Sequence, residues 1–294
     1  IDLHIKGFEA MGAKINLEQG YVKAKVGRLK GIQFYFDTVS VTGTANLIMA
    51  AVLAEGKTTL ENAAKEPEVV FLADILNQIG AKISGHGTDI ITIQGTTSLK
   101  PIKCAIFSDR IEAGTFMIAA AITKGDVTIE NCNPQHLEPI TLKLQEAQAD
   151  VKIGKNRIRV KGKNIIDSVN AKTHPYPGFP TDIQAQFMAL MTLAQGQSII
   201  VETVFENRFM HVAELKRMGA DISLDGHTAI IKGVKALSGA PLMATDLRAS
   251  ASLVLAALAA KGQSVISRVY HIDRGYVGIE KKLSKLGAQI RRIK

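Results

Sequence analysis

The sequence predicts an α/β (α+β) protein assembled from several copies of one β-α-β-α-β-β unit. A small-residue signature recurs after amphipathic segments. It stands at Met11-Gly12-Ala13, Ile79-Gly80-Ala81, Ala147-Gln148-Ala149, Met218-Gly219-Ala220 and Leu286-Gly287-Ala288. Its alanines step by 68, 68, 71 and 68 residues, and a marker glycine (Gly56, Gly125, Gly196, Gly262) precedes each of the last four by 24–26 residues. A fixed period of this size indicates one supersecondary unit copied along the chain.

Each unit opens with a polar residue followed by an Ala-rich apolar helix. The four openings are Ser40, Asp109, Asp182 and Asp246, and the helices include residues 44–53 and 252–260. Each helix is followed by its marker glycine, which is the expected C-terminal stop. We therefore predict that these helices end at the glycines.

Strands and a second helix complete the unit. The predicted first strands are residues 58–60, 127–129, 198–201 and 264–266, and a second helix is predicted near residues 213–218. Alternating runs at 222–224 and 228–231 flank Asp225-Gly226, which is a strong hairpin signal. Equivalent turns are predicted at residues 85–87 and 154–156. Alternating helices and strands favour helices packed on sheets.

The chain of 294 residues is long enough for two domains with their own cores. The repeat phasing predicts a boundary near residue 107, which separates residues 1–107 from residues 108–294. The marker glycine that belongs to Ala13 would fall about a dozen residues before Ile1 by the same period. We therefore expect the chain to begin partway through a repeat, with an N-terminal part missing.

The composition narrows the class of protein. Apolar residues make up 46% and charged residues 21%, as in ordinary globular proteins, and no apolar run approaches the ~18 residues of a membrane span. The formal net charge of +9 favours anionic partners in general. Cys104 and Cys132 lack metal-like spacing and read as reduced thiols, and no histidine pair has metal spacing.

Charged residues recur at matched places in the repeats. Ser40, Asp109 and Asp246 each lie 16 residues before their marker glycine, whereas Asp182 lies 14 before Gly196. Arg208 and Arg274 each lie 12 residues after theirs. Predicted helix starts favour bound anions, and arginine adds a fork suited to phosphate or carboxylate. The acidic residues and the serine can equally be simple N-caps, so both interpretations remain open.

Five stretches carry a resemblance to a known family. They are Asp109-Arg110-Ile111-Glu112-Ala113-Gly114-Thr115, Gly178-Phe179-Pro180-Thr181-Asp182-Ile183-Gln184-Ala185-Gln186, Glu206-Asn207-Arg208-Phe209-Met210-His211, Ala244-Thr245-Asp246-Leu247-Arg248-Ala249-Ser250 and His271-Ile272-Asp273-Arg274-Gly275-Tyr276. Together they resemble the UDP-N-acetylglucosamine 1-carboxyvinyltransferases, a family of bacterial enolpyruvyl transferases, and the resemblance runs over the whole chain.

The resemblance implies a two-domain inside-out α/β barrel, with repeats of the unit around buried helices. Residues 1–107 would be the remnant of the domain that carries the catalytic loop, and residues 108–294 the second domain. The implied reaction moves the enolpyruvyl group of phosphoenolpyruvate to the 3-hydroxyl of UDP-N-acetylglucosamine, which is the first committed step of peptidoglycan precursor synthesis in the cytoplasm. It implies no metal or organic cofactor and no nucleic-acid or membrane partner. The oligomeric state stays open.

The resemblance also implies roles for individual residues. Asp182 would be the general base at the sugar hydroxyl, and Asp246 a second carboxylate near the reacting centre. Arg248 and Arg274 would hold phosphoenolpyruvate, and Arg208 would take part in domain closure. Substrate contacts are implied for Ile1, Asp2, Leu3, Thr38, Val39, Ser40, Val41, Val204 and Phe205, and the cleft residues Asp109 and Glu66 have no defined role.

The chain departs from the family pattern in two ways. Thr38 stands where some members carry a lysine. The catalytic cysteine of the family and its Lys-Asn pair would lie before Ile1, and neither Cys104 nor Cys132 matches that cysteine. We therefore expect these 294 residues alone to be inactive or nearly so.

Three alternatives remain. The first is the sister enolpyruvyl transferase that acts on shikimate 3-phosphate, and the second is a non-catalytic fragment. The third is a basic nucleic-acid-binding module, which the low aromatic content (5%, with no Trp) and dispersed lysines disfavour.

Overall fold

The computed structural model describes residues 1–293, and they divide into two compact units. Unit 1 comprises Ile1–Ile106 together with Pro175–Pro177. Unit 2 comprises Phe107–His174 and the described residues from Gly178 onward. The chain thus passes from one unit to the other between Ile106 and Phe107, and the functional identities expected for the two parts stay predictions.

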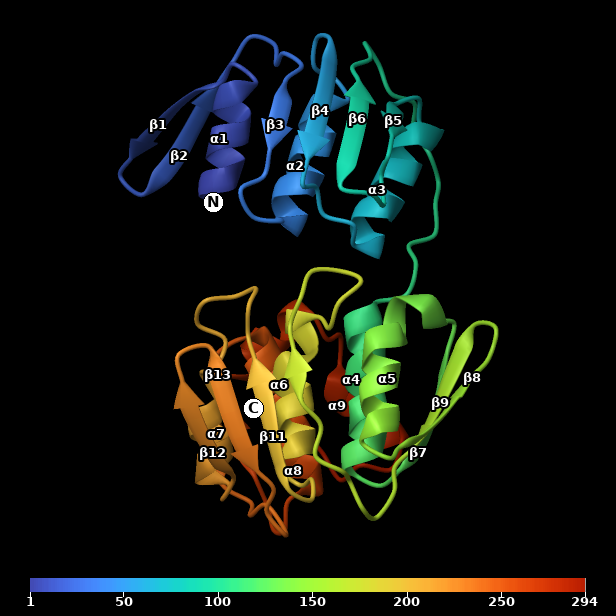
Figure 1. Cartoon of the computed structure of the whole chain (residues 1–294), viewed down its shortest axis with the longest axis vertical. Helices are drawn as coiled ribbons and strands as arrows, with labels where there is room; N and C mark the ends of the chain where they lie inside the picture. The colour runs from blue at the N-terminus through green and yellow to red at the C-terminus, as the bar shows by residue number, and fades with distance from the viewer. Residues whose placement is uncertain (294) are drawn as a thin grey trace. The chain divides into compact units, whose positions relative to one another are not determined.

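Unit 1 combines three helices with a sheet and a hairpin (Figure 1). Its elements are α1 (Asp2–Ala10), β1 (Lys14–Glu18), β2 (Tyr21–Lys25), β3 (Gln33–Tyr35), α2 (Val41–Ala51), β4 (Lys57–Glu61), α3 (Pro67–Gln78), β5 (Lys82–Ser84) and β6 (Ile90–Gln94). The sheet has the order β3-β4-β6-β5; β3 runs parallel to β4, and the other pairs are antiparallel. The apolar faces of α2 and α3 meet this sheet, so unit 1 has a core of its own.

Unit 2 contains the remaining elements, among them the 3₁₀ helices η1 and η2. They are α4 (Arg110–Ile122), β7 (Asp126–Glu130), η1 (Pro134–Leu137), α5 (Glu138–Glu146), β8 (Asp150–Ile153), β9 (Arg157–Lys161), β10 (Ala171–Lys172), α6 (Thr181–Met191), β11 (Gln197–Val201), α7 (His211–Arg217), β12 (Asp221–Asp225), β13 (Thr228–Lys232), β14 (Pro241–Met243), α8 (Leu247–Ala259), β15 (Val265–Ser267), η2 (Val269–Arg274) and α9 (Ile279–Lys285). Its sheets have the orders β7-β9-β8, β10-β11-β13-β12 and β14-β15.

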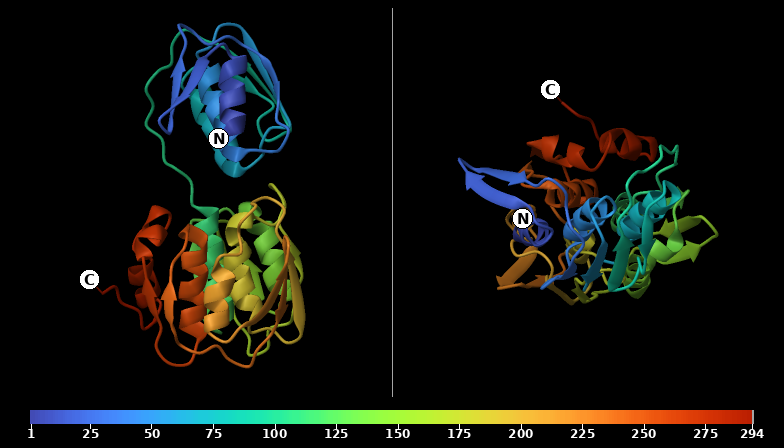
Figure 2. Two further views of the ribbon diagram at one scale, coloured as in Figure 1. Left: turned by 90° about the vertical axis from the view of Figure 1, so that its left-hand side faces the viewer. Right: turned by 90° about the horizontal axis from the view of Figure 1, so that it is seen from above.

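The helices α4, α6 and α8 pack against one another at the centre of unit 2, with the sheets around them (Figure 2). Every residue of α6 from Ile183 to Met191 is buried. Small residues make the close packing feasible: a Cβ at Gly114 of α4 would come within 2.6 Å of Ile140 and 3.1 Å of Ile183. Helices inside and sheets outside are the predicted inside-out α/β arrangement, and the fold class is confirmed.

The predicted repeat is present twice in full, as β3-α2-β4-α3-β5-β6 and β10-α6-β11-α7-β12-β13. The predicted hairpin at Asp225-Gly226 joins β12 to β13, and Gly226 has φ +53° as such a turn requires. The copies that contain α4 and α8 have fewer strands among the described residues, with sheets of three and two strands.

The prediction that the helices end at the marker glycines was wrong. Helices α2 and α6 end at Ala51 and Met191, and Gly56 and Gly196 follow in the turn that enters the next strand, with φ of +92° and +101°. At the marker Gly125, the left-handed residue is Lys124 with φ +58°. The glycines therefore supply the backbone conformation that starts a strand, not the helix cap.

The predicted openings of these helices are confirmed. Helix α2 starts at Val41 and α8 at Leu247, directly after Ser40 and Asp246, which cap them.

Candidate active site

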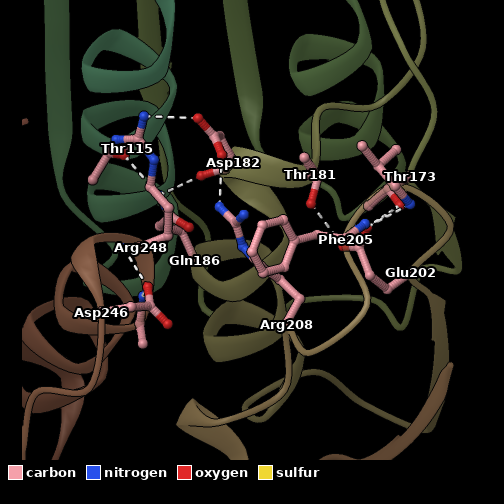
Figure 3. A network of polar contacts seen from close by, with 12 residues as sticks. Thr115, Thr173, Thr181, Asp182, Gln186, Glu202, Phe205, Arg208, Asp246 and Arg248 are labelled. Atoms are coloured by element: carbon pink, nitrogen blue, oxygen red, sulfur yellow. Dashed lines mark hydrogen bonds and ion pairs between the residues drawn. The ribbon is translucent and has the colours of Figure 1, made fainter. Parts of the chain in front are cut away.

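Asp182 is held between two arginines from different elements of unit 2 (Figure 3). It is the second residue of α6. Its Oδ1 accepts a hydrogen bond from Nη2 of Arg208 at 2.6 Å, and its Oδ2 accepts one from Nη2 of Arg248 at 2.8 Å. Arg208 lies in the loop between β11 and α7, and Arg248 lies in the first turn of α8. We call Asp182, Arg208 and Arg248 the acid clamp.

Electrostatics keep the Asp182 carboxyl ionised. Its side chain is 36% exposed, and those of both arginines are 13% exposed. Burial alone raises the pKa of Asp182, but the guanidinium groups of Arg248 and Arg208 outweigh burial and hold that pKa below its ordinary value of 3.8. Burial lowers the pKa of Arg248, and Asp182 outweighs that effect, so the pKa lies above its ordinary value. The clamp is thus a set of fixed charges at neutral pH.

The other acids at matched helix starts act as caps. One carboxylate oxygen of Asp109 accepts from the backbone N–H groups of Ile111 and Glu112 at 2.7 and 3.0 Å. Oδ1 of Asp246 accepts from those of Arg248 and Ala249 at 2.8 and 2.9 Å.

Ser40 caps α2 in the same way, through a 3.1 Å hydrogen bond from the N–H of Gly43. At α6 the N-cap is Pro180, which offers no side-chain bond. The capping interpretation is therefore correct for Ser40, Asp109 and Asp246 and wrong for Asp182.

A buried carboxylate fixes the loop that carries Arg208. Glu202 follows β11 and is 2% exposed. It accepts hydrogen bonds from the hydroxyls of Thr173 and Thr181 and from the backbone N–H groups of Val204 and Phe205. The Phe205 ring lies under the guanidinium of Arg208, 4.9 Å from its central carbon to the ring centroid.

The side chains of Thr115, Gln186 and Tyr276 form a buried hydrogen-bonded group next to Arg248. The Tyr276 hydroxyl lies 2.8 Å from Oγ1 of Thr115 and accepts from Nε2 of Gln186 at 3.2 Å. The same Gln186 nitrogen is 3.0 Å from the backbone oxygen of Asp182, so this group also ties into the first turn of α6. The Arg248 guanidinium lies over the Tyr276 ring at 5.6 Å.

Arg274 ends η2 and is exposed, and among residues 1–293 no ion pair or hydrogen bond joins it to Asp182. Its neighbour Gly275 lies against the start of α8. A Cβ at Gly275 would stand 3.0 Å from Leu247 and 3.5 Å from Nη1 of Arg248. The structure thus brings the Arg274 segment next to Arg248, while the Arg274 side chain extends into solvent.

His211, the first residue of α7, is fully buried beside the same loop. Burial lowers the pKa of its imidazole to about 4, with the charge of Asp246 opposing and that of Arg208 adding to the effect. The ring is therefore neutral at physiological pH.

In unit 1, two helix N-termini lie side by side. Nδ1 of His4 in α1 is 2.8 Å from the side-chain nitrogen of Asn46 in α2, and its Nε2 is 3.3 Å from the hydroxyl of Thr42. The residues expected to bind nucleotide lie at these two helix starts: Ile1, Asp2 and Leu3 at α1, and Thr38, Val39, Ser40 and Val41 at α2. Paired helix N-termini are suited to an anion.

Curated relatives match the whole chain. The protein from Desulfosudis oleivorans is 60% identical over 293 residues, and the one from Geobacter metallireducens is 59% identical over 294. Both are named UDP-N-acetylglucosamine 1-carboxyvinyltransferase, and the match covers 100% of this chain and 70% of each relative. The chain belongs to the UDP-N-acetylglucosamine 1-carboxyvinyltransferase family.

The wider family confirms the type of enzyme. Residues 1–283 match the family described as EPSP synthase (3-phosphoshikimate 1-carboxyvinyltransferase). Members of the UDP-N-acetylglucosamine 1-carboxyvinyltransferase family are enolpyruvyl transferases, and this chain is one of that class.

Solved structures agree in fold. The enolpyruvyl transferase NikO from Streptomyces tendae has a TM-score of 0.89 at 24% identity, over 99% of this chain and 72% of that one. An EPSP synthase from Acinetobacter baumannii has a TM-score of 0.74 at 22% identity, over 99% of this chain and 71% of that one. At such identities the likeness concerns the fold alone.

A grouped set of metal ligands and a membrane-spanning helix are both absent from the described residues. Among residues 1–293, no three His, Cys, Asp or Glu side chains are grouped as metal ligands would be. Within the same residues, no helix has both the length and the apolar character needed to cross a bilayer.

Sequence reasoning gave no role to several residues around the acid clamp, namely Thr115, Thr173, Thr181, Gln186, Glu202, Gly275 and Tyr276. The sequence does offer a signal for Glu202, because this residue is an acid directly after the apolar strand β11. Tyr276 and Gly275 lie inside the last quoted motif, but their partners come from residues far away in the sequence.

Proposed function

We propose that this protein transfers the enolpyruvyl group from phosphoenolpyruvate to the 3-hydroxyl of UDP-N-acetylglucosamine with release of phosphate. The observation that carries the proposal is the 57–60% identity, over the whole chain, to curated relatives that all bear the name of this activity. This activity would serve the first committed step of peptidoglycan precursor synthesis in the bacterial cytoplasm, and through it cell shape and division.

The reaction sequence needs a base and a site for anions. The sugar hydroxyl oxygen bonds to C2 of phosphoenolpyruvate while a general acid delivers a proton to C3, which gives a tetrahedral adduct. Loss of a proton from C3 to a base and of phosphate from C2 then restores the double bond. Asp182 is our candidate for the group that takes the hydroxyl proton, because it is an ionised carboxylate in the clamp and part of a matched motif.

The acid clamp suggests how substrate binding prepares this base. While both arginines pair with Asp182, its pKa is low and its proton affinity is weak. An anionic donor that attracts Arg248 to its own carboxylate and phosphate would weaken the pairing of Arg248 with Asp182 and raise the pKa of Asp182. Arg248 then stabilises the charge that develops on the donor.

The remaining predicted residues have supporting parts in this proposal. Arg274, which is exposed next to Gly275, would join Arg248 on phosphoenolpyruvate. Asp246 uses Oδ1 to cap α8 and so fixes the first turn that carries Arg248.

The candidate contacts to the UDP-sugar fall into two separate groups of residues. Val204 and Phe205, both partly exposed, would contact it in unit 2. In unit 1 the paired starts of α1 and α2 would hold its nucleotide part.

The test is release of phosphate from phosphoenolpyruvate by the gene product that contains this sequence. We expect release with UDP-N-acetylglucosamine as acceptor and none with shikimate 3-phosphate. The reverse preference would establish the sister activity, which the description of the wider family also names.

Binding gives a second test that needs no turnover. Calorimetric titration of the 294-residue chain with UDP-N-acetylglucosamine should show saturable binding that UDP alone weakens. Absence of binding by a folded chain would remove the support for this acceptor.

A further inference from the structure

Glu202 is a buried charge whose two oxygens join different parts of unit 2. Its Oε1 accepts from the hydroxyl of Thr173 at 2.8 Å and from the N–H groups of Val204 and Phe205 at 2.9 and 3.1 Å. Its Oε2 accepts from the hydroxyl of Thr181 at 2.9 Å. A buried carboxylate is costly unless its oxygens are hydrogen-bonded, so these four bonds fix the position of the group.

The two carboxylate oxygens of Glu202 hold the two segments that carry Arg208 and Asp182 of the acid clamp. Oε1 fastens the loop that runs from Val204 to Arg208, and Oε2 fastens Thr181, the first residue of α6 and the neighbour of Asp182. Arg208 and Asp182 meet at 2.6 Å, and among residues 1–293 no hydrogen bond joins Glu202 to either of them. Figure 3 shows Glu202 and Thr181 beside this ion pair.

We propose that Glu202 is a positioning residue that sets the Asp182–Arg208 pairing by tying the Arg208 loop to the start of α6. The proposal rests on the proposed function only in giving that pair a catalytic purpose. No motif and no role expected from the sequence included Glu202.

The first experiment removes only the hydrogen bond that Oε2 of Glu202 accepts from Thr181. Thr181→Val deletes the hydroxyl next to Asp182 and keeps the shape of the side chain. The matched control is Thr192→Val at the other end of α6, where a buried hydroxyl donates to the backbone oxygen of Ala189 at 2.7 Å. A hydrogen bond to a charged group is strong enough that, in the gene product that contains this sequence, we expect Thr181→Val to lower kcat about tenfold, with little change from Thr192→Val.

A double-mutant cycle separates positioning from plain stabilisation. In an Arg208→Ala background the pair is already lost, so Thr181→Val should cause no further loss of kcat. The same factor of loss in both backgrounds would overturn the proposal. Glu202→Gln keeps an oxygen at the Oε1 position and should retain more activity than Glu202→Ala.

The closing experiment needs no turnover. Urea unfolding of wild type, Asp182→Asn, Arg208→Ala and the double variant gives the coupling between these residues, and the cycle is repeated in Thr181→Val and Thr192→Val. We expect Thr181→Val to lose most of the coupling and Thr192→Val to keep it. Full coupling in Thr181→Val contradicts the proposal, whereas lost coupling in a protein without transferase activity refutes only the proposed function.

Discussion

The starts of α6 and α8 occupy equivalent places in the repeat, yet the aspartates at these starts bind different kinds of partner. Asp246 lies directly before α8 and gives one oxygen to two backbone N–H groups of its own helix. Asp182 lies two residues further along its repeat, inside the first turn of α6, and binds two arginines from other elements. A shift of two residues thus separates a helix cap from a carboxylate that pairs with arginines.

The two helix starts also depend on each other. By capping α8, Asp246 holds the turn from which Arg248 reaches Asp182. The start of α6 has no side-chain cap of its own, and its first residue is held from outside by Glu202. The comparison indicates that one start is built to present a cation and the other to present an acid.

The largest expected effect comes from Asp182→Asn. The amide keeps the shape but cannot take a proton from the acceptor hydroxyl, so kcat should fall about a thousandfold. The measurement is phosphate release with UDP-N-acetylglucosamine by the gene product that contains this sequence, with Asp109→Asn as control because asparagine also caps a helix. Equal losses in the two variants would remove the distinction between capping and clamped acids.

Arg248→Lys should have the next largest effect. Lysine keeps the charge but loses the planar fork that reaches Oδ2 of Asp182 across the Tyr276 ring. We expect kcat/KM for phosphoenolpyruvate to fall about a hundredfold, as for loss of one oriented donor to developing charge. Lys282→Arg on the exposed face of α9 is the control and should leave kcat/KM unchanged.

His211 should make the stability of unit 2 depend on pH. Its folded pKa is about 4 against an ordinary 6.5, so the unfolded chain takes up a proton first as the pH falls. The stabilisation is complete above pH 6.5 and is lost towards pH 4, by at most about 3 kcal/mol. Asp246 and Arg208 are the charged groups that oppose and reinforce this effect.

Urea unfolding between pH 7 and pH 4.5 measures the contribution of His211. His211→Phe should flatten the profile relative to wild type, and His227→Phe on the exposed turn should not. An unchanged slope in His211→Phe would show that the buried imidazole does not titrate as described.

The smallest expected effect concerns the cap of α8. Asp246→Ala removes the bonds to two backbone N–H groups and should lower the free energy of unfolding by about 1 kcal/mol. Asp246→Asn keeps the cap and should recover most of that loss in the same urea titration. If both variants lost the same stability, the negative charge and not the cap would be what holds α8.

The sequence was sufficient for the fold because the repeat and its turns are local signals. The Gly-Ala signature and Asp225-Gly226 mark positions that short-range backbone preferences decide. The helix ends were misplaced because Gly56 and Gly196 serve the following strand, which pairs with partners far away in the sequence.

Only part of the candidate site could be predicted from the sequence. Asp182, Arg208 and Arg248 could be selected from matched motifs, and the different offset of Asp182 was visible in the sequence. Tyr276 could not, because its contact to Thr115 depends on tertiary packing. Glu202 could be noticed as an acid after an apolar strand, but its bond to Thr181 also depends on tertiary packing.

The most direct test of the account is the titration of the Asp182 carboxyl by carbon NMR in protein labelled at aspartate, with Asp182→Asn to assign the signal. We predict a pKa below 3.8, a rise of that pKa in Arg248→Lys, and a rise on addition of phosphoenolpyruvate. A pKa at or above 3.8 in the free protein, unchanged by Arg248→Lys, would contradict the clamp and with it the distinction between α6 and α8.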